Sequence, residues 1–406
     1  MTAADPARTV RKRHVFYVPG HDPAGGRRYR EIYRAEAAKQ AAVSGYRIDV
    51  EGLPPEDGVY RWQAEATIDG VTTRTTFDFL LWNDLVKQSL NKSMLATYWL
   101  TLRTFWAYLA SGTLAAIARV RPVMLFSTLY PIAVYLLTPV AGLLAGLLVA
   151  WIAGLVLPVP GWATALAMLA GMAAALALLR RYDQRFFITY LVLAYAYIAQ
   201  NRGGTPPGLY ERGLKFNERI AAALASDVDE VLIVGHSAGA GIGVSLCAML
   251  LRDGKVPPGK LALLGIGSVT QMISFLPKAQ WMRADLNLLA QTAHLAWIEV
   301  SAPSDGMCFA LSDPAATSGV NPPPEKKRWP VVFSAAYHQS LSEAVRNDPD
   351  FNIYRKHFQY IHAFDRPRDY DYFQITAGPR TLMARYGGRK SSKGRIDRPA
   401  SRYRDF

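Results

Sequence analysis

Hydrophobic and polar residues alternate along two neighbouring segments in the N-terminal part of the chain, residues 60–68 and 71–81. Alternation with a period of two is typical of strands with one buried face, and the Asp69-Gly70 pair between the segments is a typical hairpin turn. Short apolar runs predict further strands at residues 13–20, 231–234, 261–266, 294–300 and 329–337. Helices are predicted at residues 29–44, 211–225 and 238–251. Strands that alternate with helices predict an α/β fold with a mostly parallel sheet covered on both faces.

A much longer apolar segment interrupts this series, because residues 122–179 contain no charged residue. A membrane-spanning helix needs about 17–25 predominantly apolar residues, so the segment is long enough for two spans. The sequence LPVPGW at residues 157–162 is a turn signal. It divides the segment into two predicted transmembrane helices, at about residues 130–156 and 162–179. The alternative is a hairpin buried inside a large soluble core.

Four residues of the first predicted span bear on its shape. Pro131 and Pro139 predict a kink or a re-entrant start, because proline lacks the amide proton that a helix uses. Gly142 and Gly146 form a small-xxx-small pair, which allows two helices to approach closely.

The formal net charge of this 406-residue chain is +14, and basic residues flank the apolar segment. Arg119 and Arg121 precede the segment, and Arg180, Arg181 and Arg185 follow it. The turn between the two predicted spans has no charge. Lys and Arg concentrate in cytoplasmic loops, so both ends of the hairpin are expected on the cytoplasmic side, with a bacterial inner membrane as the expected location.

The hairpin divides the chain into four parts. Residues 1–110 and 186–384 are predicted to form the two halves of one α/β domain, with residues 111–185 as an inserted transmembrane hairpin. Residues 385–406 are rich in Arg, Lys, Gly and Ser and are predicted to be a disordered tail, either solvated or attracted to anionic lipid headgroups. Nucleic-acid binding is not expected, because no aromatic-and-basic motif accompanies the charge.

Only two cysteines occur, Cys247 and Cys308, so a disulfide framework is not expected and a reducing compartment fits better. No Cys and His residues have the spacing of a zinc site, and neither a metal nor an organic cofactor is expected. Residues 1–14 lack the apolar core of a cleavable secretory signal.

The candidate chemistry lies at residues 230–243, EVLIVGHSAGAGIG, where an apolar run breaks at Gly-His-Ser-Ala-Gly and restarts as a helical pattern. A strand, a tight turn and a helix would hold Ser237 clear of the backbone as a nucleophile elbow, in which Gly235, His236 and Gly239 surround the serine. The helix that follows directs its N-terminal amides at the site. A glycine-rich turn with only a packing role is one alternative. A dinucleotide-binding turn is another, but the glycines lack the G-x-G-x-x-G register.

Together these motifs resemble the α/β-hydrolase superfamily. The matching features are the early strand that ends in VPGHD, the GHSAG elbow and a later strand that leads into APSDG. Their order covers most of the chain outside the apolar segment. The HFQYI sequence at residues 357–361 is similar to a pattern in bacterial membrane-associated relatives. The resemblance implies a catalytic triad in the chain order Ser, then Asp or Glu, then His.

The acidic member of this triad is expected to be Asp305. It follows the strand HLAWIEV at the carboxyl edge of the predicted sheet, where it would orient a histidine. Alternatively, Asp305 is a solvated turn residue without a catalytic role. Asp84 is the reserve, although it would break the superfamily's chain order. Asp227 and Asp229 precede a strand and therefore lie at the wrong edge.

Three histidines downstream of Asp305 are candidates for the base. His357 is preferred, because its aromatic-rich segment could fold back over the site. His338 is the first alternative, because it directly follows the last predicted strand, and His362 is the second. His294 begins a strand and is expected to be structural.

Two backbone amides should bind the developing oxyanion. The amide of Ala238 is the first, because this residue follows the nucleophile. The second should come from the loop after the early strand, at Gly20 or His21. The His21 side chain itself is expected to shape the pocket.

The sequence thus predicts a membrane-anchored serine hydrolase that cleaves an ester or a thioester through Ser237, His357 and Asp305. Its expected partners are membrane lipids and an ester or acylated small-molecule substrate, and lipid-like substrates are favoured because the hairpin could deliver them from the bilayer. Two alternatives are a non-catalytic membrane scaffold that retains the fold, and an acyltransferase that uses the same triad with another acceptor.

Overall fold

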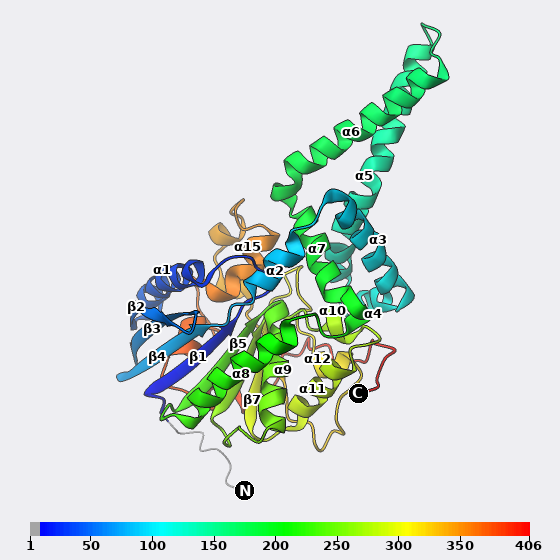
Figure 1. Ribbon diagram of the computed structural model, residues 1–406. Helices are drawn as coiled ribbons and strands as arrows, with labels where there is room; N and C mark the ends of the chain where they lie inside the picture. The colour runs from blue at the N-terminus through cyan, green and yellow to red at the C-terminus, as the bar shows by residue number, and fades with distance from the viewer. Residues whose placement is uncertain (1–8) are drawn as a thin grey trace.

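Eight strands form one sheet in the computed structural model, which describes residues 9–406 (Figure 1). In chain order they are β1 (Lys12–Val18), β2 (Arg47–Glu56), β3 (Val59–Ile68), β4 (Val71–Phe79), β5 (Glu230–His236), β6 (Leu261–Ile266), β7 (Leu295–Ser301) and β8 (Val331–Ser334). Their spatial order is β2-β3-β4-β1-β5-β6-β7-β8. Strands β4, β1, β5, β6, β7 and β8 pair in parallel, whereas β2 and β3 add an antiparallel edge. The prediction of a mostly parallel α/β sheet is therefore confirmed.

Most of the remaining chain is helical. The longer helices are α1 (Gly26–Ser44), α2 (Asn83–Leu90), α3 (Met94–Ala110), α4 (Thr113–Val120), α5 (Pro122–Gly154), α6 (Gly161–Phe186), α7 (Ile188–Ala199), α8 (Leu209–Ala225), α9 (Ala238–Arg252) and α11 (Gln280–Gln291). The shorter ones are α10 (Gln271–Ser274), α12 (Pro314–Thr317), α13 (Tyr337–Ser340), α14 (Glu343–Arg346), α15 (Ile353–Phe358), α16 (Tyr372–Ala377) and α17 (Leu382–Tyr386), with 3₁₀ turns η1 (Gln200–Gly203) and η2 (Gln359–Ile361).

The centre of the sheet is covered on both faces. Every residue of β5, β6 and β7 is buried, which a strand achieves only when side chains of both faces are shielded from water. Helices α8, α9 and α11 lie over the front of the sheet in Figure 1. On the antiparallel edge, α1 contacts β2 and β3. The central parallel strands are therefore continuous runs of mainly apolar residues, because neither face of the sheet is exposed to water there.

The elements that the apolar runs predict are present, with bounds close to the expected ones except for β8, which is much shorter than the predicted strand at residues 329–337. The Asp69-Gly70 hairpin turn is also present, and both residues have the positive φ that such a turn needs, 53° and 76°. Strand β2 was not predicted. Its sequence RIDVEGLPPE contains two prolines and a glycine, which are tolerated here because β2 is an exposed edge strand.

Helices α5 and α6 project away from the body as an antiparallel pair (Figure 1). By length and composition both can cross a membrane, and only 22% and 6% of their most apolar stretches are buried. The alternative of a hairpin buried in a soluble core is therefore wrong. So is the predicted start near residue 130, because α5 begins at Pro122 and continues through Pro131 and Pro139 as one helix, without a re-entrant piece.

Glycines allow the two helices of this pair to touch. A Cβ on Gly142 would lie 2.6 Å from Met172 Cα, and one on Gly146 would lie 2.1 Å from the Ala167 carbonyl oxygen. From α6, Gly171 approaches Gly142 equally closely. Contact between backbones is therefore possible only without side chains at these positions, as the small-xxx-small pair predicted.

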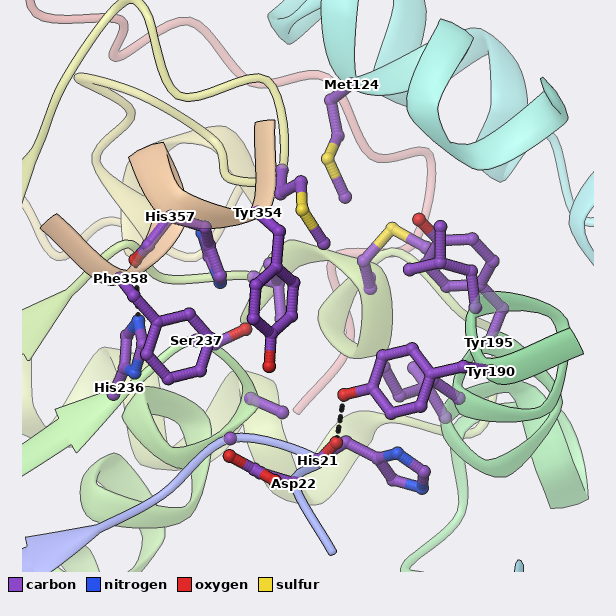
Figure 2. Close-up of a pocket in the computed structure, with 18 of the residues that line it drawn as sticks. His21, Asp22, Met124, Tyr190, Tyr195, His236, Ser237, Tyr354, His357 and Phe358 are labelled. Carbon is purple, nitrogen blue, oxygen red and sulfur yellow. Dashed lines mark hydrogen bonds between the residues drawn. The ribbon is translucent and has the colours of Figure 1, made fainter. Parts of the chain in front are cut away.

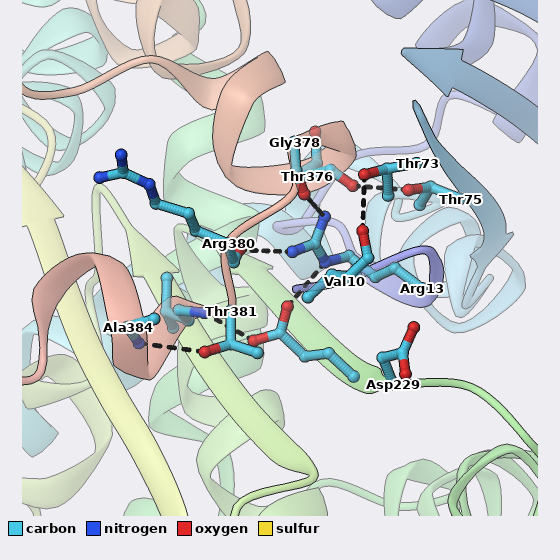
Figure 3. Close-up of polar contacts among 12 residues, drawn as sticks. Val10, Arg13, Thr73, Thr75, Asp229, Thr376, Gly378, Arg380, Thr381 and Ala384 are labelled. Carbon is cyan, nitrogen blue, oxygen red and sulfur yellow. Dashed lines mark hydrogen bonds and ion pairs between the residues drawn. The ribbon is translucent and has the colours of Figure 1, made fainter. Parts of the chain in front are cut away.

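A buried arginine fastens the C-terminal region to the sheet (Figure 3). Arg13 of β1 donates to Glu230 of β5 over 2.7 Å, and the side chains of the pair are 0% and 2% exposed. The same guanidinium donates to the carbonyl oxygens of Gly378 and Arg380, over 2.7 Å each. One cation on β1 therefore satisfies partners from two distant segments of the chain, β5 and residues 378–380.

The prediction of a disordered tail at residues 385–406 is wrong, because this segment lies along the body. Ile396 forms a bridge with Ser312, and the buried Arg283 pairs with Asp405 at 3.0 Å. Composition suggested disorder because the tail has few large apolar side chains. Backbone hydrogen bonds and ion pairs hold it instead, which composition does not report. The first eight residues, for which no secretory signal was predicted, lie outside the described part of the chain.

Candidate active site

Ser237 occupies a tight turn between β5 and α9, with φ 56° and ψ −120°. This conformation is costly for a residue with a side chain, and such strain persists only where the surroundings impose it. The two glycines of the turn explain how it forms. A Cβ on Gly235 would lie 2.5 Å from Ala240 Cα, and one on Gly239 would lie 2.1 Å from the Val18 carbonyl oxygen. The apolar run therefore breaks at Gly-His-Ser-Ala-Gly because α9 crosses both β5 and the end of β1 at contact distance.

Asp305 follows β7 and lies fully buried, with His357 of α15 as its partner. The His357 Nδ1 atom lies 2.8 Å from Asp305 Oδ2. Tyr360 donates its hydroxyl to the same oxygen over 2.8 Å, and the amide of Met307 donates to Oδ1 over 2.9 Å. Burial opposes ionisation of this carboxyl group, but the neighbouring His357 and these hydrogen bonds outweigh it and hold the pKa of Asp305 below its ordinary value. Asp305 is thus an anion that fixes the His357 ring.

His236 supports the same histidine from below. Its Nε2 atom lies 2.9 Å from the His357 carbonyl oxygen, and burial lowers the pKa of His236 to about 3. A neutral ring therefore donates to the backbone of α15 and fixes its position above the elbow. Sequence reasoning gave neither His236 nor Tyr360 a role in orienting His357, because both act through contacts between distant segments.

Ser237 and His357 line one cavity, and Figure 2 shows both facing it. Its free volume is about 60 Å³, enough for a short acyl group or two water molecules. Apolar side chains form most of its wall, among them Met124 of α5, Tyr195 of α7 and Met307. The helices at the base of the projecting hairpin therefore contribute directly to the wall around the serine.

No hydrogen bond joins Ser237 Oγ to His357 within the described part of the chain. The serine side chain lies instead over Gly20, where an added Cβ would be 3.0 Å from Ser237 Cβ and 3.5 Å from its Oγ. Catalytic hydrogen bonds are often long or poorly aligned in the absence of a ligand and tighten when the substrate binds. The backbone amides expected to bind the oxyanion belong to two residues next to Ser237. Ala238 begins α9, and Gly20 lies against the serine side chain.

The His21 side chain points away from the serine. Its Nε2 atom lies 2.8 Å from Ser89 Oγ, and burial lowers the pKa of His21 to about 4. The His21 carbonyl oxygen accepts a hydrogen bond from Tyr190, as the dashed line in Figure 2 shows. A neutral, tightly held ring that lines the cavity fits the expectation that His21 shapes the pocket.

The alternative histidines do not line this cavity. His338 is exposed at α13, and His362 bonds through Nδ1 to the Phe358 carbonyl oxygen at 2.7 Å. His294 immediately precedes β7. Of the three downstream candidates, only His357 is brought to Ser237 and Asp305.

The alternative carboxylates have other partners. Asp84, the reserve candidate, forms an ion pair with Arg212 at 2.6 Å. Asp227 pairs with Lys12 at the opposite edge of the sheet, where Asp229 also lies. Within residues 9–406, no three His, Cys, Asp or Glu side chains gather in a way that could hold a metal ion.

Comparison of the chain with known protein families, with curated proteins and with solved structures finds no match. The assignment of a function therefore depends on the arrangement of Ser237, His357 and Asp305 and on the chemistry of the cavity around them.

Proposed function

We propose that this chain is a serine hydrolase of the α/β-hydrolase type that cleaves an ester or a thioester. The observation that carries the proposal is a serine in a strained strand-to-helix turn, in one cavity with a histidine whose other nitrogen is bound to a buried carboxylate. These three groups are what activation of a serine hydroxyl requires. The proposed fold family rests on the same elbow and on the parallel sheet that presents it.

In the proposed reaction, Ser237 Oγ attacks the carbonyl carbon of the substrate while its proton passes to His357 Nε2. Asp305 stabilises the imidazolium that forms, and the amide of Ala238 donates to the oxyanion. The imidazolium then protonates the leaving oxygen or sulfur, which departs and leaves an acyl group on Ser237. Water, deprotonated by His357, attacks this acyl-enzyme, and the imidazolium returns the proton to Ser237 Oγ as the acid is released.

The cavity wall favours an apolar acyl group. Three methionines contribute to it, and their flexible side chains can move to enlarge a cavity of about 60 Å³. A short acyl chain fits directly, whereas a longer one requires Met124, Met272 or Met307 to move. We place the enzyme at the cytoplasmic face of a bacterial inner membrane, with α5 and α6 as the anchor, because basic residues flank these helices at the end that joins the body.

Hydrolysis of p-nitrophenyl esters of increasing chain length by the purified full chain tests this proposal. We expect release of p-nitrophenol by the wild type, and a loss of at least about 10³-fold in Ser237→Ala and in His357→Ala. His338→Ala is the matched control, because His338 is exposed and lies outside the cavity. Equal rates in the wild type and Ser237→Ala would overturn the proposal.

The second candidate is a non-catalytic membrane scaffold with the same fold. One observation favours it, namely the lack of a hydrogen bond between Ser237 Oγ and His357 among the described residues. A scaffold would hydrolyse no ester and would show no reactive serine. The strain at Ser237 argues against it, because a turn with only a packing role has no need of a costly backbone conformation.

A further inference from the structure

Helix α3 turns its polar face inward and its apolar face outward. Its buried residues are Thr97, Thr101, Thr104 and Tyr108. Its exposed large residues recur every three or four positions, and they are Leu95, Trp99, Leu102, Trp106 and Leu109, 49–83% exposed. In a helix of a soluble protein the apolar stripe faces the core, so this inverted pattern indicates that α3 contacts an apolar phase. Two tryptophans on the outer stripe are typical of the interface between membrane and water.

The charge of this part of the chain has one sign. Between Asp84 and Asp183 the sequence contains no acidic residue, but it contains the basic residues Lys87, Lys92, Arg103, Arg119, Arg121, Arg180 and Arg181. A surface of one sign repels a second copy of itself and attracts an anionic one. The complement of α3 and its neighbours is therefore a surface that is both apolar and negatively charged.

A cavity of about 280 Å³ is lined by residues of α2, α3 and α7. Figure 1 shows these helices near the base of the hairpin. Arg103 and Leu100 contribute to it from α3. Both lie between the outward stripe and the buried threonine face, so the cavity borders the stripe. Lys92, which precedes α3, lines the same cavity.

The polar groups around this cavity are hydrogen-bond donors without a carboxylate among them. Lys92 and Arg103 form no ion pair within the described part of the chain. Tyr197 and Gln200 also line the cavity, and the Tyr197 hydroxyl and Gln200 Nε2 are buried atoms without a hydrogen-bond partner in residues 9–406. Burial raises the pKa of Tyr197 to about 12, so its hydroxyl keeps its proton and can donate. Two cations and two unpaired donors around one space are suited to an anion with several oxygens.

We propose that this cavity binds the phosphate headgroup of an anionic phospholipid whose acyl chains lie along the outward stripe of α3. The phosphate would accept hydrogen bonds from Lys92, Arg103, Tyr197 and Gln200. The stripe would cover the apolar part of the lipid with Leu95, Trp99, Leu102, Trp106 and Leu109. This site is separate from the elbow at Ser237, and the proposal does not depend on catalysis there.

A lipid accounts for both the cationic cavity and the apolar stripe of α3, whereas each competing occupant accounts for only one of these features. A soluble phosphate would fill the cavity but leave the tryptophans of α3 in water. A second copy of the chain would cover the stripe but bring like charges together. Helix α3 also contacts α5, which itself exposes apolar side chains, among them Val123 (48%) and Phe126 (71%).

Titration of the delipidated full chain in detergent with phosphatidylglycerol and with phosphatidylcholine, read by native mass spectrometry, tests the proposal. We expect phosphatidylglycerol to bind more tightly. Lys92→Gln/Arg103→Gln should bind it about thirtyfold more weakly, since two cations near a lipid headgroup are lost. Lys215→Gln/Arg328→Gln is the matched control, because it removes one exposed Lys and one exposed Arg that lie outside the cavity, and its affinity should be unchanged.

Tyr197→Phe keeps every charge and removes one donor, so it should weaken phosphatidylglycerol binding about fivefold even if the double variant fails to fold. Equal affinity for the two lipids, or unchanged affinity in Lys92→Gln/Arg103→Gln, would overturn the proposal. Displacement of phosphatidylglycerol by an equal concentration of inorganic phosphate would also overturn it and would identify the cavity as a site for a soluble anion. A dimer that forms through α3 and excludes the lipid would do the same.

Discussion

Asp305 carries the proposed chemistry through its hydrogen bonds. A buried carboxylate is costly unless its oxygens are satisfied, and Asp305 receives one hydrogen bond each from His357, Tyr360 and the Met307 amide. These donors keep the group ionised, which holds the His357 ring in the tautomer whose Nε2 can accept the serine proton. The hydrogen-bonded carboxylate, more than the histidine alone, makes the site resemble a working triad.

Replacing Asp305 therefore tests directly whether its carboxylate orients His357 for catalysis. Asp305→Asn keeps the shape of the side chain but can stabilise the other tautomer of His357, so ester hydrolysis should fall about 10³–10⁴-fold. Tyr360→Phe removes one donor and leaves the carboxylate charged, so its rate should fall by about tenfold or less. Steady-state kinetics of both variants checks this order. A larger loss in Tyr360→Phe than in Asp305→Asn would contradict it.

Glu299 of β7 is a second buried carboxyl group, and it is outside the proposed mechanism. Among residues 9–406 its one hydrogen-bond donor is Trp297 Nε1, 2.8 Å away, and burial raises the pKa of Glu299 to about 8. The folded protein keeps this proton at pH values where the unfolded chain, with an ordinary pKa of 4.5, has lost it. Stability is therefore expected to fall as the pH rises from 4.5 to about 8, by up to about 1.4 kcal/mol per pH unit.

Glu299→Gln removes this titration and keeps the oxygen that accepts from Trp297. Relative to the wild type, the variant should gain stability as the pH rises from 4.5 to about 8, because only the wild type must bury a group that prefers to ionise. Apparent midpoints of thermal unfolding in detergent, measured across this range, check the trend. Glu325→Gln, at an exposed position, should show no such trend. A constant difference between Glu299→Gln and the wild type would rule out the shifted pKa.

At the scale of elements, the buried pair of Arg13 and Glu230 joins β1 and β5 to the C-terminal segment. Arg13→Met would leave Glu230 as an uncompensated buried charge, which typically costs about 3–5 kcal/mol of unfolding free energy. Arg13→Met/Glu230→Gln should recover part of this loss, because it removes the charge. Thermal unfolding of the single and double variants in detergent measures both effects.

A matched surface pair controls for this prediction. Arg47 and Asp49 lie 2.9 Å apart with side chains 78% and 67% exposed, so Arg47→Met should cost at most about 1 kcal/mol. An equal effect of Arg13→Met and Arg47→Met would mean that the buried pair does not hold the C-terminal segment in place.

Apolar runs and turn chemistry were sufficient to predict most strands of the sheet and the elbow, because buried parallel strands and glycine turns are local signals. Helix α3 was not predicted, since the interpretation of helical periodicity assumes that the apolar stripe faces inward. The position of α7 in the wall of the cavity also could not be predicted. Its sequence ITYLVLAYAYIA is apolar throughout and gives no preferred face.

At the scale of the whole molecule, the sequence predicted the three residues of the candidate triad but not what holds them. Ser237 was indicated by its neighbours, and Asp305 by its place after a strand. His357 was only one of three candidates, because the fold of a loop decides which histidine returns to the elbow. The supporting contacts of His236 and Tyr360, and the ordered tail, are products of tertiary structure alone.

The proposed orientation predicts which parts of the molecule lie on opposite sides of a membrane. Leu157 is 64% exposed between α5 and α6, and Lys255 is exposed after α9. A membrane-impermeant maleimide should label Leu157→Cys in intact bacterial cells and Lys255→Cys only after lysis. The native cysteines, Cys247 and Cys308, are buried and should not interfere. Labelling of Lys255→Cys in intact cells would reverse the proposed topology.

The central claim is that Ser237 is a nucleophile activated by His357. Its most direct test is reaction of the folded full chain with a fluorophosphonate, followed by mass spectrometry of the peptides. We predict a phosphonyl adduct on Ser237 that forms at the same rate in the wild type and in His338→Ala, and at least about 10³-fold more slowly in His357→Ala. No adduct on folded wild-type protein, or an equal rate in His357→Ala, would contradict the account and favour the scaffold.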